Sequence, residues 1–229
     1  MASVDNHNRR PVRRLPMPQM EGAIARWYTK ARGSGNQLAT YRQQAAQLTA
    51  DLPDGARVLE VAPGPGYLAV EMARSGRLQV TALDISRTFV EIAAGNARQA
   101  GVSVDVRLGD VQHMPFDDGS FELVVCQAAF KNFAEPVRAL DEMHRVLHAG
   151  GRAVIQDMSR LATGADIARE VAGMGLGRLD SLFTRMTLAM LRLRAATPAR
   201  FEHLAAESAF RTCEIGVEGL GMEVRLTKN

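Results

Sequence analysis

The sequence predicts an α/β protein built on a doubly wound sheet, and three observations carry this prediction. Short apolar segments rich in β-branched residues alternate with longer segments of helical spacing over most of the 229 residues. A strand-like segment, a glycine and proline turn and a helix-like segment follow one another at 57–76. A second strand-like segment, 80–84, ends in Asp84, where a doubly wound sheet places an acid next to a nucleotide ribose. We therefore expect a nucleotide-like ligand at the carboxyl edge of the sheet.

The glycine turn is the most informative stretch. Residues 57–61 form a short, mainly apolar run, 62–66 form the turn, and 67–74 have helical spacing. Gly64 and Gly66 let the backbone approach a ligand where a Cβ atom would collide, and the helix that follows points its first amides to the same place. The turn also fits the dinucleotide pattern G-x-G-x-x-A, so a nicotinamide cofactor is a second possibility.

The other elements follow from apolar spacing, turn residues and caps. Residues 159–196 interrupt the alternation and are expected to be a methionine-rich helical insertion after the fifth strand. The remaining expected elements are helices at 19–30 and 37–52, strands at 104–108 and 121–127, a helix at 136–148, a strand at 152–157, a helix that Thr197 caps and Pro198 begins, and a hairpin of 211–217 and 222–228.

The chain resembles the class I S-adenosylmethionine-dependent methyltransferases from about residue 21 onward. It looks most like their small-molecule branch, which includes the ubiquinone and menaquinone C-methyltransferases. The resemblance rests on the order of Glu60, the two turn glycines, Asp84, Gly109-Asp110 and the turn at 147–151. It implies a Rossmann-like sheet of seven strands with the last strand antiparallel, and S-adenosyl-L-methionine as methyl donor.

The resemblance also implies which residues hold the donor. Glu60 lies near the amino group of its methionine part, Asp84 holds both ribose hydroxyls, and Asp110 contacts the adenine amino group, roles that suit carboxylate acceptors. For Asp110 the alternative is capping of the next turn, and for Tyr28 it is packing alone. The full set of expected cofactor residues is Tyr28, Glu60, Ala62, Gly64, Gly66, Asp84, Ile85, Asp110, Val111 and Gln127.

Two stretches depart from the family pattern. Ala62 replaces the first glycine of the turn, and 130–133 stands where relatives often carry a pair of histidines. In-line methyl transfer is a positioning task that needs a base only if the acceptor must lose a proton. The candidate bases are His113, Lys131 and Asp157, and for Lys131 a solvated side chain at a helix start is the alternative.

No metal site is predicted. His144 and His148 are four residues apart, as helical metal ligands would be, but no third ligand accompanies them. The helix dipole explains a histidine in the last turn, which is where we expect His148. Cys126 and Cys213 are expected to be reduced thiols.

Composition limits the function further. The formal charge is +3, and residues 1–14 hold four arginines against one aspartate, leaving 24 basic and 24 acidic side chains elsewhere. Basicity is therefore local, and no nucleic-acid groove is expected. Residues 1–20 are expected to be a disordered basic tail, and 21–229 one methyltransferase domain. Without an apolar leader or a membrane span, we expect a cytoplasmic protein, a monomer or homodimer with no integral membrane association.

The expected function is methyl transfer from S-adenosylmethionine to a small, apolar acceptor. Two alternatives remain at this point: a nicotinamide-dependent oxidoreductase, and a catalytically silent S-adenosylmethionine-binding protein that recruits a partner. The insertion at 159–196 is expected to lie over the active site as a lid, although a structural helix pair or a dimer surface explains its methionines equally well.

Overall fold

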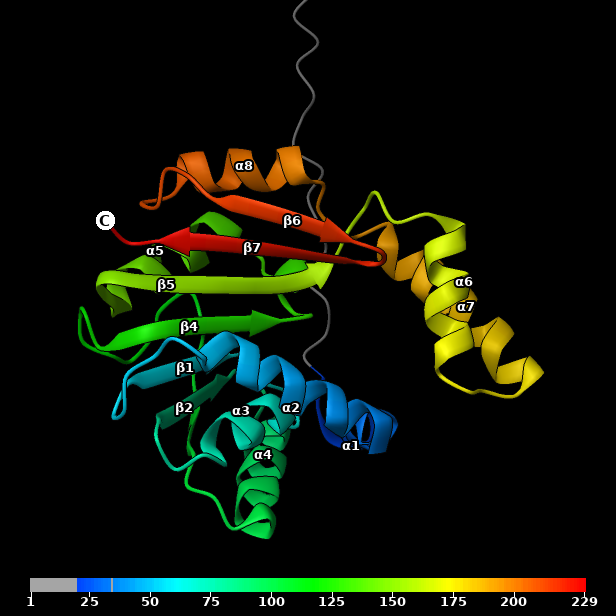
Figure 1. Ribbon diagram of the computed structural model, residues 1–229, viewed down its shortest axis with the longest axis horizontal. Helices are drawn as coiled ribbons and strands as arrows, with labels where there is room; N and C mark the ends of the chain where they lie inside the picture. Colours follow the sequence, from blue (N-terminus) through cyan, green and yellow to red (C-terminus); the bar gives the residue numbers. More distant parts are fainter. Residues whose placement is uncertain (1–19, 34) are drawn as a thin grey trace, which may run out of the picture.

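The computed structural model describes residues 20–33 and 35–229, which fold around one mixed sheet (Figure 1). In these residues the sheet has seven strands in the order β3-β2-β1-β4-β5-β7-β6. The first five pair in parallel, while β7 runs antiparallel to β5 and β6. The predicted fold class is therefore confirmed. The strands are β1 Arg57–Val61, β2 Gln79–Asp84, β3 Asp105–Leu108, β4 Phe121–Gln127, β5 Leu147–Met158, β6 Glu214–Glu218 and β7 Gly221–Thr227.

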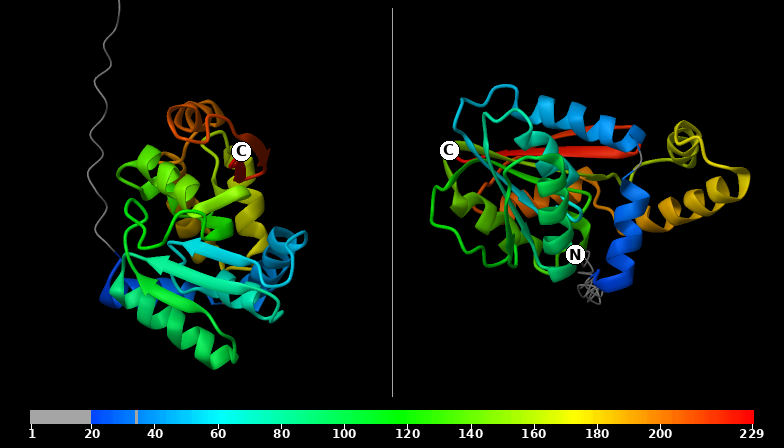
Figure 2. Two further views of the ribbon diagram at one scale, coloured as in Figure 1. Left: turned by 90° about the vertical axis from the view of Figure 1, so that its left-hand side faces the viewer. Right: turned by 90° about the horizontal axis from the view of Figure 1, so that it is seen from below.

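Helices cover both faces of the sheet (Figures 1 and 2). Neighbouring residues of β1 point to opposite faces, so Val58 belongs to the same core cluster as Met72 of α3, whereas Leu59 belongs to the cluster that contains Phe201 of α8. Helix α2 shares the face of α3, and α5 shares the face of α8. The helices are α1 Gly22–Arg32, α2 Gly35–Thr49, α3 Tyr67–Ala73, α4 Arg87–Ala100, α5 Pro136–Val146, α6 Gly164–Gly173, α7 Arg178–Arg192 and α8 Pro198–Glu207, with a short 3-10 turn at Phe130–Asn132.

Helix α5 ends earlier than the sequence predicts. Leu147 already has an extended backbone, and it pairs with Phe121 of β4, so β5 begins there. His148 therefore lies in a strand, and the explanation of His148 by a helix dipole is wrong. Its Nε2 atom is instead 3.4 Å from Oε1 of Glu122. Cys213, expected in a strand, lies just before β6.

The helical insertion after β5 is confirmed. Helices α6 and α7 project past the carboxyl end of β5, away from the sheet (Figures 1 and 2). The side chain of Thr163 accepts a hydrogen bond from the amide of Asp166, and that aspartate caps Thr163 in return, which fixes the start of α6. Every helix in the described ranges is too short or too polar to cross a membrane. The expected basic tail lies outside the described residues apart from Met20.

Candidate functional site

A cavity of about 310 Å³ opens at the carboxyl ends of β1, β2 and β4. Its volume is in the range of sites for small ligands and cofactors. Nine of the ten expected cofactor residues line it, namely Tyr28, Glu60, Ala62, Gly64, Asp84, Ile85, Asp110, Val111 and Gln127. The tenth, Gly66, does not. The topology explains this convergence, because parallel strands bring their carboxyl ends to one edge of the sheet.

Glu60 is the most unusual group in this wall. It is only 2% exposed, and its Oε2 atom has no hydrogen-bond partner within the described chain. Burial, with a smaller contribution from the charge of Asp84, raises the pKa of Glu60 to about 8, while the amide of Ala69 acts in the opposite direction. A buried acceptor without a donor is costly, so the site is suited to a ligand that brings a cationic donor.

Asp84 stands at the end of β2 and is 5% exposed. Its Oδ2 atom accepts the amide of Gly64 at 3.0 Å, and its Oδ1 atom accepts the amide of Ser86 at 2.8 Å. Burial raises the pKa of Asp84 to about 6, against the effect of these amides. Each carboxylate oxygen has a second lone pair, so hydroxyls of a ligand can still bind.

The glycine turn is held in left-handed backbone conformations. Ala62 has φ 52°, Gly64 φ 55° and Gly66 φ 74°. A Cβ atom on Gly66 would lie 2.8 Å from the Cβ atom of Ala93 in α4. Gly66 thus has a packing role, because it lets α4 approach the turn. Its expected role next to a ligand stays a prediction.

Asp110 serves the turn that follows β3 as well as lining the cavity. Its Oδ1 atom accepts the amide of Gln112 at 2.9 Å, which matches the capping alternative. At the end of β4, Gln127 donates from Nε2 to Oε1 of Gln44 at 2.9 Å and to Oε1 of Gln156 at 3.2 Å. This amide chain fixes the orientation of the Gln127 side chain at the cavity.

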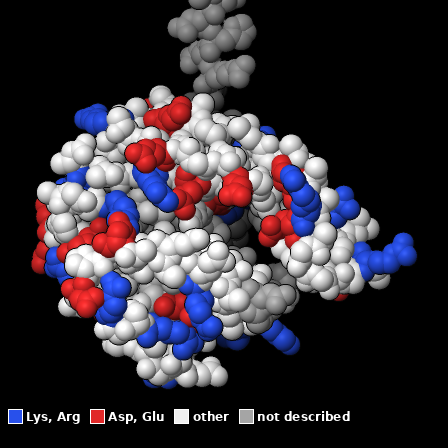
Figure 3. All heavy atoms as spheres, in the orientation of Figure 1, with Lys and Arg blue, Asp and Glu red and all other residues white. Residues whose placement is uncertain are grey.

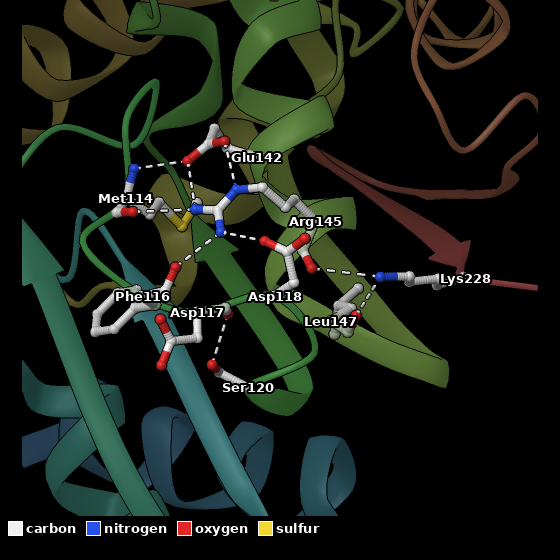
Figure 4. Close-up of polar contacts among 9 residues, drawn as sticks. All are labelled: Met114, Phe116, Asp117, Asp118, Ser120, Glu142, Arg145, Leu147 and Lys228. Atoms are coloured by element: carbon white, nitrogen blue, oxygen red, sulfur yellow. Dashed lines mark hydrogen bonds and ion pairs between the residues drawn. The ribbon is translucent and has the colours of Figure 1, made fainter.

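Arg145 of α5 anchors the segment of Met114 and Phe116, which follows Asp110 in the chain (Figure 4). Its guanidinium donates to the carbonyls of Met114 and Phe116, at 3.0 and 2.8 Å, and pairs with Glu142 through two hydrogen bonds of 2.7 and 2.9 Å. Glu142 also accepts the amide of Met114 at 2.7 Å. These partners raise the pKa of Arg145 and lower that of Glu142. Pattern reasoning on the sequence did not single out Arg145.

The start of α1 is tied to α4, a contact that pattern reasoning also missed. The carboxylate of Glu21 accepts the amides of Arg87 and Thr88 at 2.9 and 3.1 Å and the Thr88 hydroxyl. These bonds cap the first turn of α4 and lower the pKa of Glu21, the Thr88 hydroxyl most of all. They place Met20 in the cavity wall. An acid 66 residues from the helix it caps leaves no local signal in the sequence.

None of the three candidate bases lines the cavity. His113 is exposed in the turn after Asp110. Lys131 and Asp157 bind each other, with the Nζ atom 2.7 Å from Oδ1. Their side chains are nearly buried, so Lys131 is not the solvated lysine of the alternative. The catalytic role of all three stays a prediction.

No group of metal ligands occurs in the described part of the chain. His144 lies edge-on against Phe210 with ring centroids 5.0 Å apart, and burial lowers its pKa. His148 is on a strand, so the two histidines do not share a helix face.

Comparison with known proteins identifies a family that matches part of the chain. A methyltransferase domain family matches residues 59–155, the stretch from β1 to β5 that holds Glu60, Asp84 and Asp110. Residues 59–155 are therefore similar to that methyltransferase family. The expected resemblance is confirmed.

The curated proteins similar to this chain include a demethylmenaquinone methyltransferase and a ubiquinone biosynthesis O-methyltransferase. A demethylmenaquinone methyltransferase of Deinococcus radiodurans is 35% identical over 124 residues, 54% of this chain and 51% of that protein. A ubiquinone biosynthesis O-methyltransferase of Xanthomonas axonopodis pv. citri is 34% identical over 122 residues, 53% of this chain and 50% of that protein. The matches thus span about half the length of these relatives.

Solved structures agree with the methyltransferase fold. A putative S-adenosyl-L-methionine-dependent methyltransferase of Methanococcus maripaludis has a TM-score of 0.70, covers 93% of this chain and 95% of its own, and is 20% identical. At that identity the likeness concerns the fold alone. The [4+2]-cyclase SpnF is 31% identical, with a TM-score of 0.52, over 58% of this chain and 50% of that one.

Proposed function

We propose that this protein transfers a methyl group from S-adenosylmethionine to a small, apolar organic acceptor. The observation that carries the proposal is Glu60, a buried carboxylate with an unpartnered oxygen in the same cavity as Asp84. S-adenosylmethionine has an ammonium group at one end and ribose hydroxyls near the other. The two carboxylates fit these groups, and the methyltransferase domain matches this part of the chain.

The residues of the cavity divide the work of holding the donor. Glu60 accepts hydrogen bonds from the ammonium group, and Asp84 accepts them from the ribose hydroxyls. Ile85 and Phe89 line the wall near Asp84 and offer apolar surface to the adenine, with Asp110 and Val111 at its edge. When the donor is bound, its sulfonium supplies an activated methyl group.

The wall after β4 supports an apolar acceptor. Ala128, Ala129, Phe133 and Ala134 line the cavity there. The relatives are named for demethylmenaquinone and ubiquinone biosynthesis, which supports an acceptor of the quinone class. The described lining holds no histidine, lysine or cysteine, so the enzyme contributes by aligning the acceptor with the methyl carbon and excluding water.

The lid role of 159–196, a monomeric or homodimeric state, a cytoplasmic location and the lack of nucleic-acid binding stay predictions.

Titration calorimetry with S-adenosylhomocysteine tests the donor site. The change Asp84→Ala should weaken binding by about 1.5 to 3 kcal/mol, which is a Kd about 10- to 150-fold higher. Asp105→Ala is the control, because this exposed acid of β3 lies outside the cavity. Equal affinity of the folded Asp84 variant and the wild type would refute the ribose assignment. Transfer of label from methyl-labelled donor to a demethylated quinone then tests the reaction.

A second candidate is a protein that binds the donor without transferring its methyl group. The likeness to a protein named a [4+2]-cyclase shows that relatives at this identity include one named for another reaction. Donor binding with no labelled product from any extracted small molecule would favour this candidate. The nicotinamide-dependent alternative finds no support among the relatives, and NADH should not compete with S-adenosylhomocysteine.

A further inference from the structure

Helix α7 exposes an apolar stripe along its whole length. Leu179 is 84% exposed and Met190 69%, and the other large side chains of the set are all more than half exposed. The positions recur at intervals of one, three and four residues, so they lie on one side of the helix. The α7 stripe consists of Leu179, Leu182, Phe183, Met186, Met190 and Leu193.

The opposite side of α7 packs against the rest of the protein. Thr184, Leu188 and Leu191 are half-buried, and the helix packs on α6. The C-terminal end is fixed, because the guanidinium of Arg192 donates to the carbonyl of Ala162 at 2.6 Å. The outward direction of the α7 stripe therefore follows from how the helix pair is packed. No part of the described chain covers it.

Arginines follow one flank of the α7 stripe. Arg178, Arg185 and Arg192 recur every seven residues, which places them on one side of the helix, next to the edge that holds Leu182. The segment 178–194 contains four arginines against one acid, Asp180. Arg178 and Arg185 are exposed, and Figure 3 shows basic side chains standing out from the projecting lobe.

We propose that α7 binds the surface of an anionic lipid bilayer. The helix lies in the plane of the interface, with the α7 stripe between the acyl chains and the headgroups and with Arg178 and Arg185 on lipid phosphates. Charge complementarity selects this occupant over a second copy of the chain. In a two-fold dimer that pairs the stripes of two antiparallel α7 helices, the arginine rows of both copies would lie along the same edge of the contact, and these like charges would repel.

Lipid binding and the proposed methyl transfer are separable properties. No residue of 159–196 is among the residues that line the cavity. Changes on the outer side of α7 should thus leave the affinity for S-adenosylhomocysteine unchanged.

Co-sedimentation of the full chain with vesicles tests the proposal. The wild type should bind vesicles of phosphatidylcholine with phosphatidylglycerol, bind phosphatidylcholine alone weakly, and lose binding as salt is raised. The pair Phe183→Glu and Met190→Glu, and separately the pair Arg178→Gln and Arg185→Gln, should each weaken binding about tenfold or more. The matched controls are Val217→Glu, an exposed apolar residue of β6, and Arg200→Gln, an exposed arginine of α8. Both should bind as the wild type does.

Three results would overturn the proposal. The first is equal binding of the wild type to vesicles with and without phosphatidylglycerol. The second is unchanged binding in both α7 variants, which would assign any lipid affinity to another segment such as the basic residues 1–20. The third is a dimer, detected by light scattering, that the Phe183 and Met190 changes abolish. The arginine pair leaves all apolar contacts in place, so it decides the matter if the glutamate pair fails to fold.

Discussion

The ammonium group of Lys131 lies 2.7 Å from Oδ1 of Asp157, in a pair whose side chains are 9% and 6% exposed. Lys131 also donates from Nζ to the carbonyl of Ala128 at 2.5 Å, and its amide donates to Oδ2 of Asp157 at 3.1 Å. Ala128 has φ 56° and lines the cavity. The ion pair therefore holds the strained turn after β4, which lines the cavity where we propose that the acceptor binds.

The change Lys131→Met should lower the free energy of unfolding by about 3 to 5 kcal/mol, because it leaves the carboxylate of Asp157 buried and unpaired. The double change Lys131→Met with Asp157→Leu should recover most of this loss. Chemical denaturation measures both. A double variant that is stable but has lost turnover, with donor affinity intact, would instead mark the pair as catalytic.

Stability of the ligand-free protein should depend on pH through Glu60. Its pKa is about 8 in the folded chain against 4.5 for the ordinary group. The folded state thus keeps a proton that the unfolded state loses, and stability present below about pH 4.5 declines as pH rises to about 8. The change Glu60→Gln should reduce this loss in the free energy of unfolding by on the order of 1 to 3 kcal/mol.

Thermal melts of wild type and Glu60→Gln across this pH range measure the effect. Glu122→Gln is the control, since this carboxylate is more exposed. Binding of an ammonium group would ionise Glu60, so calorimetry near pH 7 in buffers of different ionisation enthalpy should also detect proton release with S-adenosylhomocysteine. If the stabilities of the wild type and Glu60→Gln changed with pH in parallel, Glu60 would not be the source of the pH dependence.

The change Ala62→Gly should stabilise the protein by about 0.5 to 1 kcal/mol. A left-handed conformation costs a non-glycine residue about 1 to 2 kcal/mol, more than glycine loses in chain entropy. Ala62 has φ 52°. The same change at Ala172, exposed in α6, should destabilise the protein instead. A fall in melting temperature for Ala62→Gly would show that its methyl group packs usefully in the cavity wall.

The change Arg145→Lys should lower the free energy of unfolding by about 1 to 3 kcal/mol and also weaken donor binding. A lysine cannot reproduce the forked hydrogen bonds to Glu142 and to the loop carbonyls that Figure 4 shows. The loop that carries Asp110 would then be held less firmly. Asp118→Asn is the control, because Asp118 is an exposed partner of the same guanidinium. Normal donor affinity in Arg145→Lys would show that Arg145 stabilises the fold without contributing to donor binding.

Local signals in the sequence predict the sheet and most of the cavity. The apolar runs of β1 and β4 have the predicted bounds, and Glu60 and Asp84 lie at the carboxyl edge as expected. What the sequence could not show depends on partners distant along the chain. Gly66 owes its role to Ala93, and α5 stops at Val146 because the next residue pairs with β4. The Lys131 and Asp157 pair likewise joins residues that no short pattern links.

The unpartnered oxygen of Glu60 has a consequence for how long the protein lasts in a cell. A ligand whose ammonium group meets this carboxylate stabilises the folded state in proportion to the logarithm of its concentration. Proteases that attack transiently opened chains act on the small unfolded fraction, so an occupied site lowers their supply of substrate. Degradation of the protein should therefore slow when the ligand is abundant and become faster when the ligand is scarce.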